Sequence, residues 1–224
     1  MIVAVDGPAG SGKSTVCRLL AKALGYTYLD PGAMYRAVAW ALLREGSRPD
    51  DSSELTRRLR ALPLRFSVQD GSLVIRHGEQ RLDDELRGPE ISQESSRVSR
   101  LESVREFLVQ RQRELGAGGG IVAEGRDMTT VVFPDAEVKV FLTADVKTRT
   151  ERRLVEYVQK NIPMDYATLE AEIRERDERD QGRALAPLRP APDALHLDTS
   201  GLSIPEVVER ILELAREKKD EKPS

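Results

Sequence analysis

Near the start of the chain, a glycine-rich segment runs into a lysine and two hydroxyl residues. Residues 7–15 read GPAGSGKST and fit the pattern G-x-x-x-x-G-K-[ST]. Glycines let the backbone curl so that its N–H groups point at an anion, and a helix that begins near Lys13 adds the positive end of its dipole. The segment therefore predicts a loop that binds a nucleoside triphosphate (a P-loop), built from Gly7, Pro8, Ala9, Gly10, Ser11, Gly12, Lys13, Ser14 and Thr15.

The last three residues of this loop have separate expected roles. Lys13 would reach the β and γ phosphates of ATP, the hydroxyl of Ser14 would join the coordination of Mg²⁺, and Thr15 would support the α-phosphate side. A chance glycine turn is the alternative. The flanking pattern argues against it, because a short apolar run precedes the loop and a helical pattern follows it.

Two further sets of charged residues have helical spacing. Arg176, Asp180 and Arg183 are separated by four and three residues, so they share one face if the helix continues. A second set consists of Arg149, Arg152 and Arg153. Arginine forks of this kind could neutralise the phosphates of a donor and an acceptor during phosphoryl transfer. The glutamates among them fit a solvated surface helix equally well, and spacing alone leaves both interpretations open.

The elements that must position these residues follow an alternating pattern. Short apolar runs predict buried strands at residues 2–5, 26–29, 121–123, 138–142 and 194–198. Helical periodicity lies between and after them, at residues 13–24, 34–42, 101–115, 146–159 and 166–180 and after Ser203. Ser203 and Glu206 have the spacing of a capping box. The alternation predicts an α/β fold with a central parallel sheet.

The alternation breaks in the middle of the chain. Leu64, Phe66 and Val68 alternate with polar residues, and Asp70-Gly71 is a strong hairpin signal. We therefore expect a small insert with antiparallel strands at residues 62–91, projecting from a core of residues 1–61 and 92–218. Within that core a helical lid is expected at about residues 148–166, and residues 219–224 are expected to form a disordered tail.

Composition narrows the class of protein. The formal net charge is −3, so no global basic field suits a protein that coats nucleic acid. Cys17 is the single cysteine and there are two histidines, so neither a disulfide nor a zinc site of ordinary spacing is expected. No targeting segment or membrane span is apparent. These features predict a cytoplasmic protein, and the lack of a heptad pattern favours a monomer.

Four segments, taken together, resemble bacterial cytidylate kinases: GPAGSGKST at residues 7–15, LDPGAMYR at residues 29–36, EGRDMTTVVFPDA at residues 124–136 and ERDERDQGRALAPL at residues 175–188. The resemblance extends over about residues 2–216. It implies a three-layer P-loop kinase fold and transfer of the γ-phosphoryl group of MgATP to CMP or dCMP. The inserted hairpin would then correspond to the family's extra domain.

The resemblance also implies roles for individual residues. The positions expected to read cytosine are Ser96, Arg105 and Asp127. Those expected to hold the rest of CMP are Arg36 with its neighbour Tyr35, Arg126, Arg176, Asp180 and Arg183. The lid arginines expected over the donor phosphates are Arg149, Arg152 and Arg153. The catalytic set is accordingly expected to comprise Lys13, Arg126, Arg149, Arg153, Arg176 and Arg183.

Three residues depart from the family pattern. Pro31 stands where Ser or Thr is common, which removes a hydroxyl near the acceptor. Glu124, expected to orient Mg²⁺-bound water, stands in place of Asp, and Thr129 replaces a usual Gly that could require positive φ. Two rival hypotheses therefore stay open: a kinase of the same architecture acting on UMP, AMP or a small hydroxyl compound, and a nucleotide-binding regulator without turnover.

Overall fold

The computed structural model describes residues 1–46, 50–159 and 161–221. They divide into two compact units, one formed by Met1–Tyr26 with Val122–Ser224 and the other by Thr27–Ile121. The P-loop and the predicted arginine helices belong to the first unit, and the predicted hairpin insert belongs to the second.

The first unit is built on a sheet with the strand order β6-β1-β7-β8. Its strands are β1 (Ile2–Asp6), β6 (Ile121–Gly125), β7 (Val138–Thr143) and β8 (Leu195–Asp198). β1 pairs in parallel with β7, and β7 pairs in parallel with β8. Apolar side chains in the middle of β1, β6 and β7 are buried, as expected of parallel strands covered on both faces. The α/β class with a parallel sheet is confirmed.

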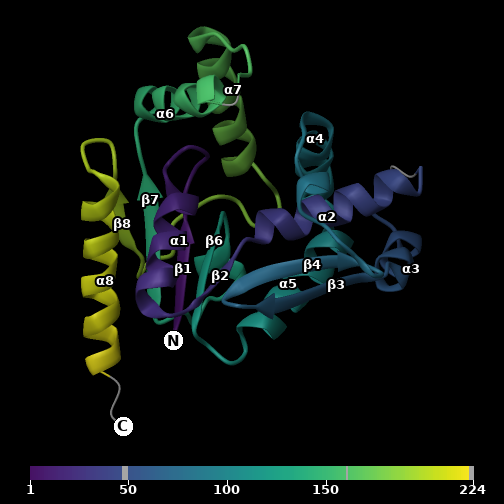
Figure 1. The fold of residues 1–224 in the computed structure, drawn as a ribbon, viewed down its shortest axis with the longest axis horizontal. Coiled ribbons are helices and arrows are strands. Elements are labelled where there is room, and N and C mark those ends of the chain that lie inside the picture. Colours follow the sequence, from purple (N-terminus) through teal and green to yellow (C-terminus); the bar gives the residue numbers. More distant parts are fainter. Residues whose placement is uncertain (47–49, 160, 222–224) are drawn as a thin grey trace. The chain divides into compact units, whose positions relative to one another are not determined.

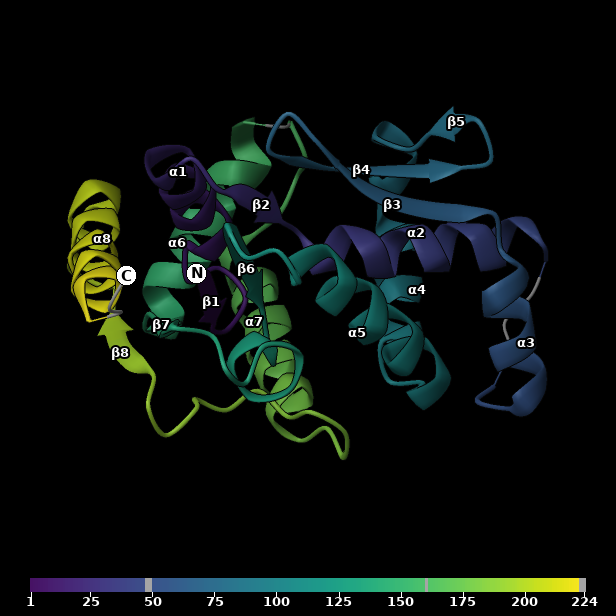
Figure 2. The same ribbon diagram turned by 90° about the horizontal axis from the view of Figure 1, so that it is seen from below.

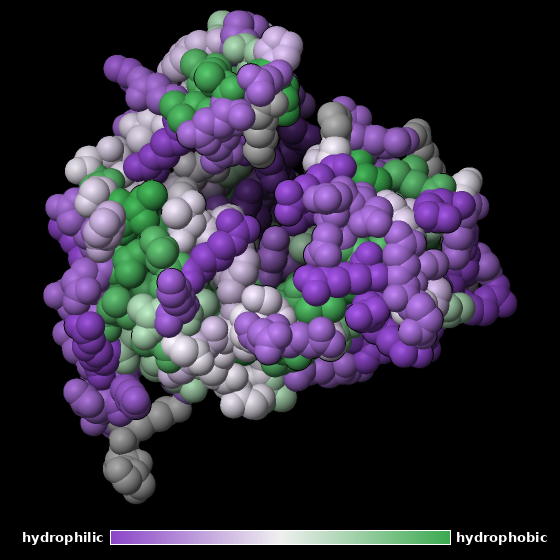
Figure 3. Space-filling model, in the orientation of Figure 1, coloured by the Kyte–Doolittle hydropathy of each residue, from purple (hydrophilic) through white to green (hydrophobic). Residues whose placement is uncertain are grey.

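Helices of the first unit follow its strands. They are α1 (Lys13–Leu24), α6 (Val146–Gln159), α7 (Tyr166–Gln181) and α8 (Ile204–Asp220). α8 packs against α1 and β7, and α6 packs against α7 beyond the carboxyl end of β7 (Figure 1). Hydrophobic atoms gather on the surface over α1 and α8 (Figure 3). Because β1 and β7 are parallel, the P-loop after β1 and the start of α6 after β7 lie at the same edge of the sheet.

The second unit combines a mixed sheet with helices. Its strands are β2 (Thr27–Leu29), β3 (Leu64–Gln69), β4 (Ser72–His77) and β5 (Gln80–Arg81), and its α-helices are α2 (Pro31–Arg44), α3 (Ser53–Ala61), α4 (Pro89–Val98) and α5 (Glu102–Gly116). β4 is antiparallel to β3 and β5 and parallel to β2. α2 and α5 pack against β3 (Figure 2). Asp70 and Gly71 both have positive φ, as the predicted hairpin turn requires.

Some boundaries differ from the expectation. The antiparallel strands lie where they were expected, but β4 also pairs with β2, so the hairpin is part of a larger unit. α8 extends to Asp220, which makes the first two residues of the expected tail helical. Residues 222–224 lie outside the described part. No helix among the described residues is long and apolar enough to cross a membrane.

Candidate active site

The P-loop needs glycine because other segments approach its backbone closely. Gly7, Gly10 and Gly12 all have positive φ, at 152°, 78° and 90°. A Cβ atom on Gly7 would lie 2.0 Å from the carbonyl oxygen of Leu142 in β7, which is far inside van der Waals contact. The glycines therefore allow the loop to sit against β7 and turn into α1.

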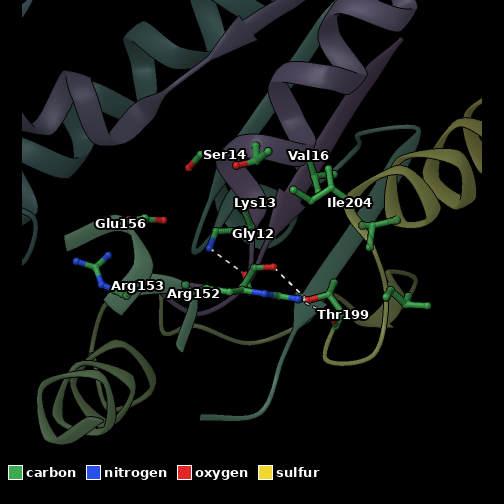
Figure 4. Close-up of a pocket in the computed structure, with 14 residues that line it drawn as sticks. Gly12, Lys13, Ser14, Val16, Arg152, Arg153, Glu156, Thr199 and Ile204 are labelled. Atoms are coloured by element: carbon green, nitrogen blue, oxygen red, sulfur yellow. Dashed lines mark hydrogen bonds between the residues drawn. The ribbon is translucent and has the colours of Figure 1, made fainter. Parts of the chain in front are cut away.

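The loop forms one wall of a cavity of about 340 Å³ (Figure 4). The other walls come from α6 and from the segment that joins β8 to α8. The lining residues are Gly10 to Val16, Arg152, Arg153, Glu156, Thr199, Leu202, Ile204 and Val207. A phosphate-binding loop at one end and apolar side chains at the other suit a ligand with an anionic tail and a flat apolar head, such as a nucleotide.

Lys13 is buried at the floor of this cavity, with 5% of its surface exposed. Its Nζ donates to the carbonyl oxygen of Pro8 at 2.7 Å and to Ser11 Oγ at 3.4 Å. Burial and the positive charge of Arg126 lower the pKa of Lys13 to about 7, while Glu124 opposes the shift. Lys13 is thus poised to gain a proton when an anion approaches it.

Behind the loop, Asp6 ties β1 to the segment that follows β6. Its carboxylate accepts hydrogen bonds from Met128 N at 2.9 Å, from Thr129 N at 2.7 Å and from the Thr129 hydroxyl at 2.7 Å. Burial raises the pKa of Asp6, although these donors oppose the shift. Asp6 could not be singled out from the sequence, because a carboxylate at a strand end belongs to no motif.

The same contacts resolve the question of Thr129. This residue lies in a π-helical turn, Met128–Val132, and is absent from the non-glycine residues with positive φ. No strain arises, because the turn keeps its backbone in an ordinary conformation while its hydroxyl serves Asp6. Glu124, at the end of β6, is buried.

A cluster of opposite charges forms where the segment after β6 meets the end of α7. Arg126 Nε donates to Asp180 Oδ2 at 2.7 Å, and Arg183 Nη2 donates to Asp180 Oδ1 at 2.5 Å. Burial opposes ionisation of Asp180, but Arg126 and Arg183 outweigh it and hold the pKa of Asp180 below its usual range. Arg183 lies beyond the end of α7, yet still reaches Asp180.

Arg176 precedes this cluster on α7. Its side chain retains solvent access, while protein atoms around the guanidinium partly desolvate it. This desolvation, followed by the positive charge of Arg126, lowers the pKa of Arg176 to about 10. The guanidinium still carries its charge at neutral pH. Arg126, Arg176 and Arg183 therefore place excess positive charge around one buried carboxylate, unlike the Arg174–Glu170 pair on the exposed side of α7.

The three lid arginines differ from one another. Arg152 lines the cavity and donates to the hydroxyl and the carbonyl oxygen of Thr199, at 3.0 and 2.7 Å. Arg153 also lines it, with its guanidinium 5.6 Å from the ring centre of Tyr157. Arg149 does not line it: it is 4% exposed and bonded to protein acceptors. The Arg149 guanidinium is therefore bonded to protein acceptors, whereas the side chains of Arg152 and Arg153 border the cavity.

The second unit brings two of its expected CMP residues together. Arg105, which is buried in α5, donates to the hydroxyl of Tyr35 at 3.5 Å. Arg36 donates to Asp30 at 3.1 Å, and Asp30 also caps α2. Pro31 occupies the first position of that helix, which suits proline because no backbone donor is needed there. Ser96 is exposed on α4.

Comparison with known proteins identifies relatives along nearly the whole chain. The sequence model of a family described as cytidylate kinase matches residues 3–217. A cytidylate kinase of Streptococcus thermophilus is 45% identical over 215 residues, which cover 96% of this chain and 95% of that protein. A cytidylate kinase of Caldicellulosiruptor bescii is 44% identical over 213 residues, covering 95% of this chain and 94% of that protein.

A solved structure supports the fold alone. An uncharacterized protein from Eubacterium ventriosum has a TM-score of 0.53 at 12% sequence identity, and the match covers 95% of this chain and 96% of that one. The family match and the two relatives, by contrast, concern the sequence itself, including the P-loop and the segment around Arg126. On these grounds, the protein belongs to the cytidylate kinase family.

Proposed function

We propose that this protein transfers the γ-phosphoryl group of ATP to CMP or dCMP, giving ADP with CDP or dCDP. The observation that carries the proposal is the family match, which spans a complete P-loop cavity and an arginine cluster in the same unit. A kinase for two polyanions needs these parts, because its catalysis is positioning combined with electrostatic stabilisation. We propose further that the enzyme is a monomer in the cytoplasm.

The donor phosphates would bind to the N–H groups of the P-loop and the start of α1. The carbonyl oxygen of Pro8, which now accepts from Lys13 Nζ, would be replaced by a phosphate oxygen. The negative charge of that oxygen favours the protonated amine, so ATP itself would restore the charge that burial disfavours. Lys13 can then stabilise charge that shifts toward the leaving ADP.

Mg²⁺ fits the oxygen donors near the loop. Ser14 presents an exposed hydroxyl on the cavity wall, and Glu124 is a buried carboxylate whose charge acts on Lys13. Among the described residues no group of three His, Cys, Asp or Glu could hold a metal ion, which suits an ion carried largely by substrate phosphates. We propose that Ser14 would bind it directly and Glu124 through water. The ion would neutralise phosphate charge during transfer.

On the acceptor side, we propose that Arg126, Arg176 and Arg183 bind the phosphate of CMP and the migrating group. Asp180 holds two of these forks in place through both of its oxygens. The acceptor phosphate is anionic at neutral pH, so no strong general base is needed. Asp180 is also proposed to accept from a ribose hydroxyl.

The residues proposed for recognition of the base are those that the family resemblance implies. Asp127, buried beside Arg126, would accept from the exocyclic amine of cytosine, while Arg105 would donate to its ring acceptors. Ser96, Arg36 and Tyr35 complete the set that the resemblance implies. Uracil carries a carbonyl in place of the amine, so a carboxylate at this position would repel it.

The acceptor is tested by ADP release from MgATP with CMP, dCMP, UMP or AMP offered singly. We expect fast turnover with CMP and dCMP only. Asp127→Ala should lower kcat/KM for CMP by about 10²-fold and raise kcat/KM for UMP, because it removes both the acceptor of the cytosine amine and the carboxylate that repels the uracil carbonyl. The exposed Asp135→Ala serves as a control. Preference for UMP or AMP would overturn the acceptor assignment, and no turnover at all would favour a regulator.

A further inference from the structure

Arg149 joins three segments of the first unit. Its Nε donates to the carbonyl oxygen of Ala144, just before α6, at 2.9 Å, and its Nη1 donates to the carbonyl oxygen of Ala9 in the P-loop at 3.3 Å. The fork also pairs with Asp177 of α7, with Nη1 to Oδ1 at 2.9 Å and Nη2 to Oδ2 at 2.6 Å. One buried side chain thus bridges the P-loop, the start of α6 and α7.

The P-loop lies against Arg149 along the backbone as well. A Cβ atom on Gly10 would lie 3.1 Å from Arg149 Cβ and 3.3 Å from its carbonyl oxygen. Any side chain at this position would press against α6, so glycine lets the loop lie close to the first turn of α6. Together with the bond to Ala9, this close approach holds the Arg149 guanidinium next to the P-loop backbone.

Asp177 connects α7 to Arg149. It follows Arg176 directly and lies three residues before Asp180, whose carboxylate holds Arg126 and Arg183. A two-point pair between a planar fork and a carboxylate sets orientation as well as distance, which a single bond does not. The Arg149–Asp177 pair therefore sets both the position of α7 along its axis and its rotation relative to the P-loop.

We propose that Arg149 and Asp177 are positioning residues that couple the donor loop to the acceptor arginines of α7. As positioning residues they would act without touching substrate. Their ion pair sets the separation between the backbone that binds ATP and the side chains, Arg176, Asp180 and Arg183, assigned to the acceptor. This inference rests on the proposed function for the identity of the acceptor, but the mechanical link itself requires only that ATP binds the P-loop.

The first test separates donor from acceptor kinetics in Asp177→Asn. Arg149 would keep its bonds to Ala9 and Ala144, so KM for ATP should stay within about twofold, while kcat/KM for CMP falls by about 10-fold to 10²-fold because α7 is misplaced. The control is Glu170→Gln, which breaks the exposed Glu170–Arg174 pair on the same helix and should match wild type. If kcat/KM for CMP in Asp177→Asn equalled that of wild type, the proposal would be overturned.

A second variant distinguishes loss of positioning from loss of folding. Asp177→Glu keeps the charge and should keep the thermal unfolding temperature near that of wild type, but its extra methylene displaces α7. We expect it to lose kcat/KM for CMP as well, and full activity would overturn the proposal. In Arg149→Met, adding Asp177→Asn should cause less than a further twofold loss, because the two residues act as one unit.

The third test does not depend on the acceptor. ATP should slow amide hydrogen exchange both in the P-loop and in α7 of the wild-type protein. In Asp177→Asn the protection of α7 should disappear while that of the P-loop remains. Protection of α7 that survives in Asp177→Asn would overturn the coupling, even if CMP proved to be the wrong acceptor. Lack of CMP turnover in the wild type would contradict only the proposed function.

Discussion

At the scale of single residues, burial decides which charges are available for chemistry. Lys13 and Asp6 are both buried and lie close together in the sequence. Asp6 accepts from three donors of the segment after β6, whereas Lys13 donates to a carbonyl oxygen and a hydroxyl of its own loop. The hydrogen bonds of Asp6 therefore anchor the segment after β6 to β1. The acceptors of Lys13 lie within the loop itself, and burial together with Arg126 lowers its pKa to about 7.

This difference predicts a proton linkage. With a pKa of about 7 in the free protein, Lys13 is largely neutral at pH 8 and must gain a proton when ATP binds, whereas at pH 6 it is already charged. ATP binding should take up about one proton at pH 8 and far less at pH 6. Calorimetry in buffers of different ionisation enthalpy measures this uptake.

Lys13→Met is the matched control for the linkage. It should abolish the proton uptake and lower kcat on the order of 10²–10³-fold, with the fold intact. Equal proton uptake by wild type and Lys13→Met at pH 8 would show that another group titrates.

At the scale of elements, hydrogen bonds at Thr199 connect α6 to the segment after β8 beside the P-loop cavity. The hydroxyl of Thr199 accepts from Arg152 and lies 3.3 Å from the carbonyl oxygen of Ser11 in the P-loop and 3.0 Å from that of Thr143 in β7. Arg152, the P-loop and β7 therefore meet at one buried hydroxyl. α8, which follows this segment, packs against α1.

Thr199→Val removes this hydroxyl without changing the shape of the side chain. Arg152 loses one of its two bonds to Thr199, so KM for ATP should rise by about tenfold, in line with one hydrogen bond to a charged group. KM for CMP should stay within about twofold, and Thr199→Ser should restore the wild-type values. Steady-state kinetics with each substrate varied in turn decides, and unchanged KM for ATP in Thr199→Val would refute this role of the Thr199 hydroxyl.

Most elements could be predicted because their patterns are local. The apolar runs placed the strands, and the Ser203–Glu206 capping box marks the start of α8 in the structure. α3 and α4 were not expected. α3 begins at a Ser52 cap and buries only Leu55 and Leu59, so its pattern is short and polar. The pairing of β4 with β2 is a long-range contact that no local pattern reports.

At the scale of the whole molecule, the candidate site residues also divide into two groups. Some belong to a local sequence motif, and others have partners far away in the sequence. The P-loop was predictable because its chemistry lies within nine consecutive residues. The pairing of Arg149 with Asp177 joins residues 28 positions apart, and that of Arg126 with Asp180 joins residues 54 positions apart. Sequence spacing cannot show such partners. It therefore grouped Arg149 with Arg152 and Arg153, although only the latter two line the cavity.

The central claim is phosphoryl transfer from ATP to a cytidine monophosphate, and following the γ-phosphate tests it most directly. The purified protein would receive ATP labelled at the γ-phosphate together with CMP, and the products would be separated. We predict that the label appears in CDP in equal amount to the ADP formed, and that Lys13→Met reduces both. Label released as inorganic phosphate, or left in ATP while CMP stays unchanged, would contradict the account.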